Sequence, residues 1–157
     1  MATITVEDGS IVSGANSYVS EVELTTYATD RGVTLTGSTD ELLIKAMDYL
    51  DQQNFIGTKK TDAQPLQWPR SFVWIDGYSV DSDEIPTLLK NVQTVIAVEI
   101  DAGYDPLLAI PRKVKREKVA SLEVEYADGS ASKTITPTIS NVLKKLVARS
   151  STSVFRA

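Results

Sequence analysis

Apolar residues recur at helical spacing in three long stretches of the chain. The longest stripe predicts a central helix over 86–102, because its members repeat at i, i+3, i+4 and i+7. These members are Ile85, Leu88, Leu89, Val92, Val95, Ile96 and Ile100. The same spacing predicts a helix in 38–54, ended by Gly57, and another that Pro137 opens and that covers 137–149.

Two helix starts carry the sequence signature of a capping box. In this motif a serine and a glutamate three residues later each accept, through the side chain, a hydrogen bond from the other's backbone N–H. Ser20 with Glu23 predicts the start of a first helix that Gly32 ends. Ser38 with Glu41 predicts the start of the second helix in the same way. We therefore expect four rigid helices with defined ends.

Alternation of apolar and polar residues predicts strands at two further places. In 1–14, apolar residues flank the turn pair Asp8–Gly9, which predicts a short hairpin or β-arm. In 112–135 we expect a second hairpin, with its turn at Asp128–Gly129. The residues expected on its apolar face are Leu122, Val124 and Tyr126.

Between these elements, 58–83 shows no periodicity while aromatic residues accumulate in it. So long a stretch without regular structure is unusual in a compact domain and tends to be functional. We expect it to pack as a flap, with Trp68 in the core and Pro69 stiffening the loop. The alternative is that Trp68–Pro69–Arg70 anchors an interface, since Trp and Arg are enriched at interface hot spots. For Arg70, pairing with a carboxylate and a role in an interface are both open.

These patterns predict one domain over 1–157 with a mainly α fold, a small bundle of about four helices. The bundle carries an N-terminal β-arm, a long aromatic loop and a protruding β-hairpin. The parts are the arm (1–14), the helical body (20–55, 86–102 and 137–149), the aromatic loop (58–83), the β-hairpin (112–135) and a tail (150–157). No apolar run approaches the roughly 20 residues of a membrane span, so we expect no membrane partner.

The absence of histidine and cysteine narrows the chemistry that the chain can perform. It removes the commonest general base, the commonest metal ligand and the thiol nucleophile. The sequence also lacks a serine-nucleophile motif and a Walker loop, so we expect no enzyme, no cofactor and no metal. Asp81, Asp83 and Glu84 precede a helix, which favours interaction with its dipole over cation binding. The net charge of −5 disfavours non-specific binding to nucleic acid.

Basic residues concentrate in 112–118, the strongest charge feature of the chain. With Trp68, Trp74 and Tyr78 for stacking, this segment could form a platform for single-stranded nucleic acid. The alternative is a hairpin that contacts a neighbouring copy through charged residues. Those residues are Lys113, Lys115, Arg116, Lys118, Glu123 and Glu125. A second candidate contact is the apolar and basic tip of the tail, formed by Val154, Phe155 and Arg156.

Several short motifs occur in a defined order along the chain. They are A-N-S-Y from Ala15, G-T-K-K from Gly57, Q-P-L-Q-W-P-R from Gln64, D-G-Y from Asp76 and E-I-P from Glu84. With this order, from about Ala15 to Tyr126, the chain resembles the small head–tail connector proteins of tailed phages, also called adaptor or head-completion proteins. Some sequences of that kind carry the label of a primosomal, single-stranded-DNA-binding-like protein.

The resemblance implies a helical protomer that assembles into a ring, typically twelvefold, beneath the portal protein. Such a ring extends the channel for double-stranded DNA without binding it tightly, and meets a stopper or tail-terminator protein. On this chain, the resemblance implies that 150–157 docks on the portal and that Lys113–Tyr126 contacts either other subunits or the downstream, tail-side proteins. The protein would then lie at the head–tail interface of the virion, after assembly in the host cytoplasm. The alternative function is a single-stranded-DNA-binding accessory protein of replication.

Overall fold

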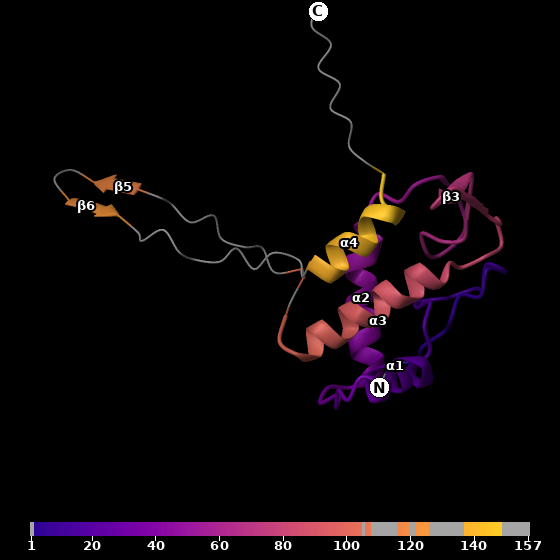
Figure 1. The fold of residues 1–157 in the computed structure, drawn as a ribbon, viewed down its shortest axis with the longest axis horizontal. Helices are drawn as coiled ribbons and strands as arrows, with labels where there is room; N and C mark the ends of the chain where they lie inside the picture. The colour runs from indigo at the N-terminus through magenta and orange to yellow at the C-terminus, as the bar shows by residue number, and fades with distance from the viewer. Residues whose placement is uncertain (1, 105, 108–115, 120–121, 126–136, 149–157) are drawn as a thin grey trace, which may run out of the picture.

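The computed structural model describes residues 2–104, 106–107, 116–119, 122–125 and 137–148. Within them the chain forms four helices and three antiparallel pairs of short strands. Figure 1 shows how the helices are arranged. The helices are α1 (Glu21–Asp30), α2 (Thr39–Asp51), α3 (Thr87–Asp101) and α4 (Pro137–Leu146). The strand pairs are β1 (Thr58–Lys59) with β2 (Arg70–Ser71), β3 (Val73–Ile75) with β4 (Tyr78–Val80), and β5 (Arg116–Val119) with β6 (Leu122–Glu125). This architecture fits a small helical or mixed fold.

The long apolar stripe of α3 puts this helix at the centre of the body. α3 packs against each of the other three helices, and its residues Leu89 and Ile96 are fully buried. The apolar faces of α2 and α4 complete the core with Leu43, Leu50 and Leu146, which are also fully buried. Each such side chain contributes roughly 1.5–3 kcal/mol when it leaves water, so the positions of the stripes determine how the helices pack.

The start and end of α1 confirm the first predicted capping box. The backbone N–H of Glu23 donates to Ser20 Oγ (3.2 Å), and the backbone N–H of Ser20 donates to Glu23 Oε2 (2.7 Å). Gly32 follows the helix with φ of 66°, a conformation that glycine adopts without a steric penalty. Local sequence alone therefore determines both ends of this helix.

The capping box predicted at Ser38 is wrong. Ser38 makes no capping bond, because its hydroxyl donates to the nearer carboxylate of Asp40. The turn before α2 is held instead by Asp101 of α3, whose carboxylate accepts the backbone N–H groups of Thr36 (3.0 Å) and Gly37 (2.7 Å). The bond from Thr36 is the main reason that the pKa of Asp101 lies below its usual value. A contact with the distant Asp101 therefore holds the turn before α2, where a local cap by Ser38 was expected.

The predicted end of α2 is also corrected. The helix ends at Asp51, before the expected Asn54. Gly57 does not stop a helix but allows two segments to approach closely: it has φ of 72°, and a Cβ atom there would lie 2.4 Å from the carbonyl oxygen of Ser71. The chain after α2 therefore turns at once into the segment that forms β1 and β2.

The N-terminal segment does not form the predicted hairpin. Instead, the buried carboxylate of Glu7 gathers three backbone N–H groups around itself. Glu7 Oε1 accepts from Gly9 (2.8 Å) and Ile11 (2.9 Å), and Glu7 Oε2 accepts from Val12 (2.9 Å). These bonds occupy donors that a hairpin ladder would need, so the segment is a tight loop.

Two strands are present in the predicted hairpin segment, but the turn differs from the prediction. The register of β5 and β6 pairs Val119 with Leu122, so the chain reverses between these two residues. The predicted turn at Asp128–Gly129 follows β6 and lies outside the described residues, as does the tail 150–157. The alternating pattern identified a strand but not its partner.

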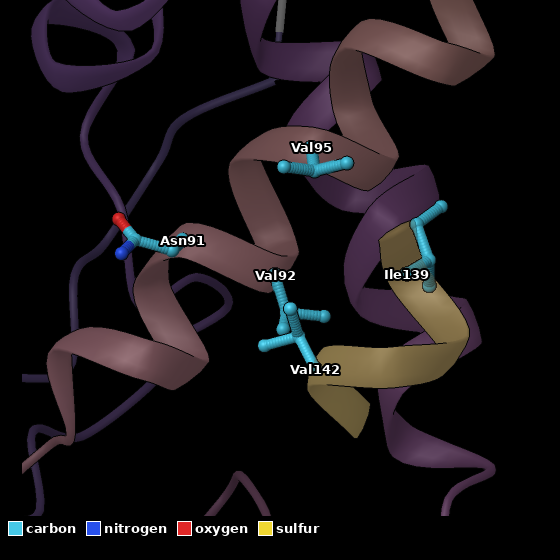
Figure 2. Close-up of a pocket in the computed structure, with 5 residues that line it drawn as sticks. All are labelled: Asn91, Val92, Val95, Ile139 and Val142. Carbon is cyan, nitrogen blue, oxygen red and sulfur yellow. The ribbon is translucent and has the colours of Figure 1, made fainter. Parts of the chain in front are cut away.

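α3 and α4 meet along an apolar seam that leaves a narrow cleft, shown in Figure 2. The cleft has a volume of about 30 Å³ and is lined by Val92 and Val95 of α3 and by Ile139 and Val142 of α4. Such a space is too small for a ligand. Among the described helices, none is long and apolar enough to cross a membrane.

A chain of hydrogen bonds runs through the core and joins three segments that are distant in sequence. Gln93 of α3 donates from Nε2 to Ser17 Oγ (2.7 Å) and accepts the backbone N–H of Tyr18 at Oε1 (2.9 Å). The hydroxyl of Tyr18 accepts the backbone N–H of Trp68 (3.0 Å). The Trp68 ring is fully buried and packs edge-on against Phe55, with 6.1 Å between ring centroids. Trp68 thus ties the segment after α2 to the core.

Replacing the buried tryptophan tests this anchor. Trp68→Ala should lower the free energy of unfolding by about 3–5 kcal/mol, because it removes a fully buried ring and leaves a cavity. The matched control is Trp74→Ala, which removes the other tryptophan, 63% exposed, and should cost less than about 1 kcal/mol. Urea denaturation followed by circular dichroism measures both. A loss below about 1 kcal/mol for Trp68→Ala would show that the ring is not part of the core.

Candidate functional site

The segment expected to lack regular structure, 58–83, contains β1 to β4, which corrects that prediction. Its second pair forms a small hairpin, residues 72–80, which we call the aromatic hairpin. The turn residues Asp76 and Gly77 both have positive φ, 52° and 89°, which is the conformation of a tight two-residue hairpin turn. Val73 is buried and Ile75 and Val80 pack partly on the core, so one face of the hairpin is fixed to the body.

Three aromatic side chains of this hairpin remain in solvent. Phe72 is 85% exposed, Trp74 63% and Tyr78 79%. The register pairs Trp74 with Ser79 and Ile75 with Tyr78, so the two aromatic residues lie on opposite faces of the hairpin: Trp74 on the outer face, and Tyr78 on the face of Ile75, next to the turn. Several exposed aromatic side chains on one short hairpin indicate an interaction site.

The backbone at Phe72 supports the same interpretation. Phe72 has φ of 59°, in the left-handed region that bulky residues rarely adopt. Its strain is maintained between two well-anchored neighbours, Ser71 in β2 and the buried Val73 in β3. Strained residues of this kind tend to cluster at functional sites. We therefore take Phe72, Trp74 and Tyr78 as the candidate interaction site.

Arg70 anchors the base of the aromatic hairpin. Its guanidinium donates to the backbone carbonyls of Ile56 (2.7 Å), Gly57 (2.8 Å) and Phe55 (3.3 Å). It also donates to the carbonyl oxygen of Gln67 (3.2 Å). No carboxylate among the described residues pairs with Arg70, so the considered carboxylate pairing is replaced by a set of carbonyl contacts. The planar, forked donor holds the two sides of the loop together.

Two further contacts fix the loop and the hairpin tip. Gln64, which is buried, donates from Nε2 to the carbonyls of Leu66 (2.9 Å) and Pro69 (3.0 Å). At the tip, the side chain of Asp76 accepts a bond from Lys145 of α4 (2.7 Å). This exposed ion pair contributes little stability, and it places the turn next to α4. The aromatic side chains are therefore presented on a well-supported scaffold.

The charge along 58–84 is mixed and acidic on balance. Over 58–84, five residues are acidic and three are basic, and one of the basic residues is Arg70, whose donors are used inside the fold. The exposed cations of this segment are Lys59 and Lys60. The segment thus combines uncharged aromatic rings with an excess of carboxylates, and Lys145 of α4 adds a cation at the hairpin tip.

The other candidate residues fall into three groups, of which one lies outside the described residues. Lys113, Lys115 and the tail residues Val154, Phe155 and Arg156 lie outside the described residues. In the backbone register of β5 and β6, Arg116 stands opposite Glu125 and Lys118 opposite Glu123. Trp68, Pro69 and Arg70 are all buried and belong to the support of the hairpin. Among the described residues, no group of acidic side chains could hold a metal ion.

Sequence reasoning noted the aromatic residues but could not separate the buried ones from the exposed ones. Trp68 and Trp74 occur in the same aperiodic stretch and differ completely in exposure, 0% against 63%. The usable signal was the turn pair Asp76–Gly77 between two apolar runs, which predicts a hairpin and therefore alternating exposure.

The fold and the site define a small protein with a helical core and an exposed aromatic hairpin. The chain belongs to the family described as "Putative DnaT-like ssDNA binding protein", whose model matches residues 2–157. No curated protein and no solved structure matches the chain. The family match agrees with the single-stranded-DNA-binding label noted from the sequence motifs, and it gives no support to the head–tail connector family.

The role of Arg70 as a clamp can be tested with Arg70→Lys. Lysine keeps the charge but offers only one nitrogen, so most of the carbonyl contacts are lost, and we expect a destabilisation of about 1–3 kcal/mol. Backbone amide exchange in β1 and β2 should become faster, because the loop loses its cross-link. Lys59→Met, on the exposed side of β1, is the control and should leave exchange unchanged. Equal exchange in Arg70→Lys and the native chain would contradict the clamp.

Proposed function

We propose that this protein is a non-catalytic assembly protein, a head–tail adaptor of a tailed phage, and that its aromatic hairpin is a surface for protein partners. The observation that carries the proposal is the combination at the hairpin: Phe72, Trp74 and Tyr78 are exposed, and acidic residues outnumber basic ones along the segment 58–84 that contains them. Aromatic side chains are enriched at the energetic centres of protein interfaces.

The electrostatics favour a protein over a nucleic acid as the partner. Binding of single strands depends on a positively charged groove that follows the phosphates, with stacking added to it. Here the net charge is −5, and in the register of β5 and β6 the basic Arg116 and Lys118 stand opposite Glu125 and Glu123. An uncharged surface on an acidic body suits a partner that binds by apolar burial.

The ordered motifs of the sequence supply the adaptor part of the proposal. They are the basis for a ring beneath the portal protein, with a stopper or tail-terminator protein on the other side and with double-stranded DNA passing through. In this proposal 150–157 docks on the portal. An acidic ring agrees with a channel that does not retain its DNA, since like charges repel. The protein has no catalytic task in this role and acts in the virion.

A second candidate is single-stranded-DNA binding in replication, and the family match favours it over the adaptor. The family description names that activity, and the match spans almost the whole chain. The geometry offers some support, since Trp74 and Tyr78 are free to stack on bases and Lys59 and Lys60 are exposed nearby. The two candidates differ in one measurable property, the salt dependence of oligonucleotide affinity.

Fluorescence anisotropy with a labelled single-stranded oligonucleotide decides between them. As an adaptor, the protein should bind with a Kd no tighter than the roughly 1–100 μM range of non-specific binding at physiological salt. Trp74→Ala should then change little, like the control Val22→Ala, which alters a 75% exposed residue of α1. A submicromolar Kd that weakens steeply with salt, and that Trp74→Ala but not Val22→Ala abolishes, would overturn the adaptor proposal in favour of DNA binding.

A further inference from the structure

The turn of the aromatic hairpin contains a peptide bond that can rearrange chemically. Asp76–Gly77 is one of three Asp–Gly pairs in the chain, with Asp8–Gly9 and Asp128–Gly129. In such a pair the backbone nitrogen of the glycine can attack the aspartate side chain, because glycine has no side chain that hinders the approach. The local structure then determines whether the two groups can meet. The third pair lies outside the described residues, and the first two differ sharply in their surroundings.

The pair near the N-terminus is protected. Gly9 is buried, and its backbone N–H, which carries the attacking nitrogen, donates to the carboxylate of Glu7 (2.8 Å). The backbone there is also closely packed, since a Cβ atom at Gly9 would lie 1.7 Å from the carbonyl oxygen of Asp83. The carboxylate of Asp8 accepts the hydroxyl (2.6 Å) and the backbone N–H (3.0 Å) of Ser10. The bond from this hydroxyl is the main reason that the pKa of Asp8 lies below its usual value, and an ionised carboxylate is a poor target for a nucleophile.

The pair at the hairpin tip is open. Asp76 and Gly77 are both exposed, and a Cβ atom at Gly77 would meet no atom of the described residues within 4 Å. The side chain of Asp76 is held by Lys145 of α4, whose Nζ lies 2.7 Å from Oδ2. Both side chains of this ion pair are about half exposed, at 61% and 49%, so the pair is weak and opens readily. The carboxyl group can therefore turn from Lys145 toward the backbone of Gly77.

We propose that Asp76–Gly77 is a site of spontaneous isoaspartate formation and that Lys145 limits its rate. The nitrogen of Gly77 forms a bond to Cγ of Asp76, and one water leaves, made of the carboxyl hydroxyl and the amide hydrogen. The product is a five-membered succinimide. Water then opens this ring at Cγ, which restores aspartate, or at the main-chain carbonyl carbon of Asp76, which gives isoaspartate. The mass of the chain is unchanged, and the steps require only water.

The modification would alter the candidate interaction site. In isoaspartate the main chain runs through Cβ and Cγ, so the two-residue turn becomes longer by one carbon atom. The turn geometry that pairs Ile75 with Tyr78 depends on two residues with positive φ. We expect the pairing of β3 with β4 to loosen and the exposed rings of Trp74 and Tyr78 to lose their fixed positions. This inference goes beyond the proposed function, because it holds whichever partner the hairpin binds.

Peptide mapping of the aged native chain tests the site. After long incubation at physiological temperature, trypsin releases 1–31 and 71–90, each of which contains one Asp–Gly pair. Isoaspartyl methyltransferase with a labelled methyl donor marks isoaspartate, and fragmentation of the peptides locates it. Labelling at Asp76 should exceed that at Asp8 by at least about tenfold, since breaking a hydrogen bond to a carboxylate slows a reaction by roughly that factor. A chain aged in urea is the control, and its two pairs should be labelled to a similar degree.

Two lysine variants test the role of the ion pair. Lys145→Met should raise the rate of isoaspartate formation at Asp76 by about two- to fivefold, the factor that a weak exposed pair can supply. The matched control is Lys144→Met, which removes the neighbouring lysine, in contact with Asn141 (3.3 Å), and should leave the rate unchanged. Equal labelling of Asp8 and Asp76 in the folded chain, or no labelling of Asp76, would overturn the proposed site. An unchanged rate in Lys145→Met would overturn the role of Lys145.

Backbone amide exchange tests the consequence for the hairpin. The isoaspartate-containing fraction of the aged chain, separated by chromatography, should exchange faster in β3 and β4 than the unmodified fraction, while α2 and α3 should exchange at the same rate in both. Equal exchange of β3 and β4 in the two fractions would show that the turn tolerates the longer backbone, which contradicts the expected change of the site.

Discussion

The hydrogen bond from the backbone N–H of Trp68 to the hydroxyl of Tyr18 is the contact on which the rest of this structure depends. It lies in a fully buried position, where an unpaired polar group would cost about 1–3 kcal/mol. Burial raises the pKa of Tyr18, so the hydroxyl stays neutral. Because the backbone of Tyr18 is held by Gln93 of α3, the bond joins the segment before α1, the central helix and the loop after α2.

This anchor determines which aromatic residues reach the surface. Once Trp68 is buried, Arg70 can reach the carbonyls of Ile56 and Gly57, and it closes the base of the hairpin. Phe72 is then exposed with a strained backbone, and Trp74, the next strand residue after the buried Val73, lies on the opposite face and is exposed. A rigid presentation matters for binding, because side chains that are already ordered lose less entropy in a complex. The contacts of Trp68 and Arg70 thus support both the core and the candidate interaction site.

Much of the helical fold could be predicted from the sequence, because the interactions that define the helices join residues close together in the chain. The apolar stripe of α3 and the capping box at Ser20 involve residues within a few positions of one another, so spacing alone identifies them. Some errors concern local side-chain contacts that compete with the predicted ones, as at Ser38 and Glu7, and others concern contacts between distant residues. Asp101 holds the turn at Thr36, and no pattern in either segment indicates the other. For the site, the sequence identified the aromatic cluster, but the exposure of Phe72 and the burial of Trp68 depend on tertiary packing.

The central claim is that this acidic protein assembles with protein partners, other copies of the chain included, by apolar burial at its exposed aromatic hairpin. Sedimentation velocity of the native chain over a wide concentration range, at low and at high salt, tests this claim most directly. The account predicts a weight-average mass that rises reversibly above that of the monomer and that persists at high salt, since salt screens charges but does not weaken apolar contacts. A chain that stays monomeric at every concentration, or whose association disappears at high salt, would contradict it.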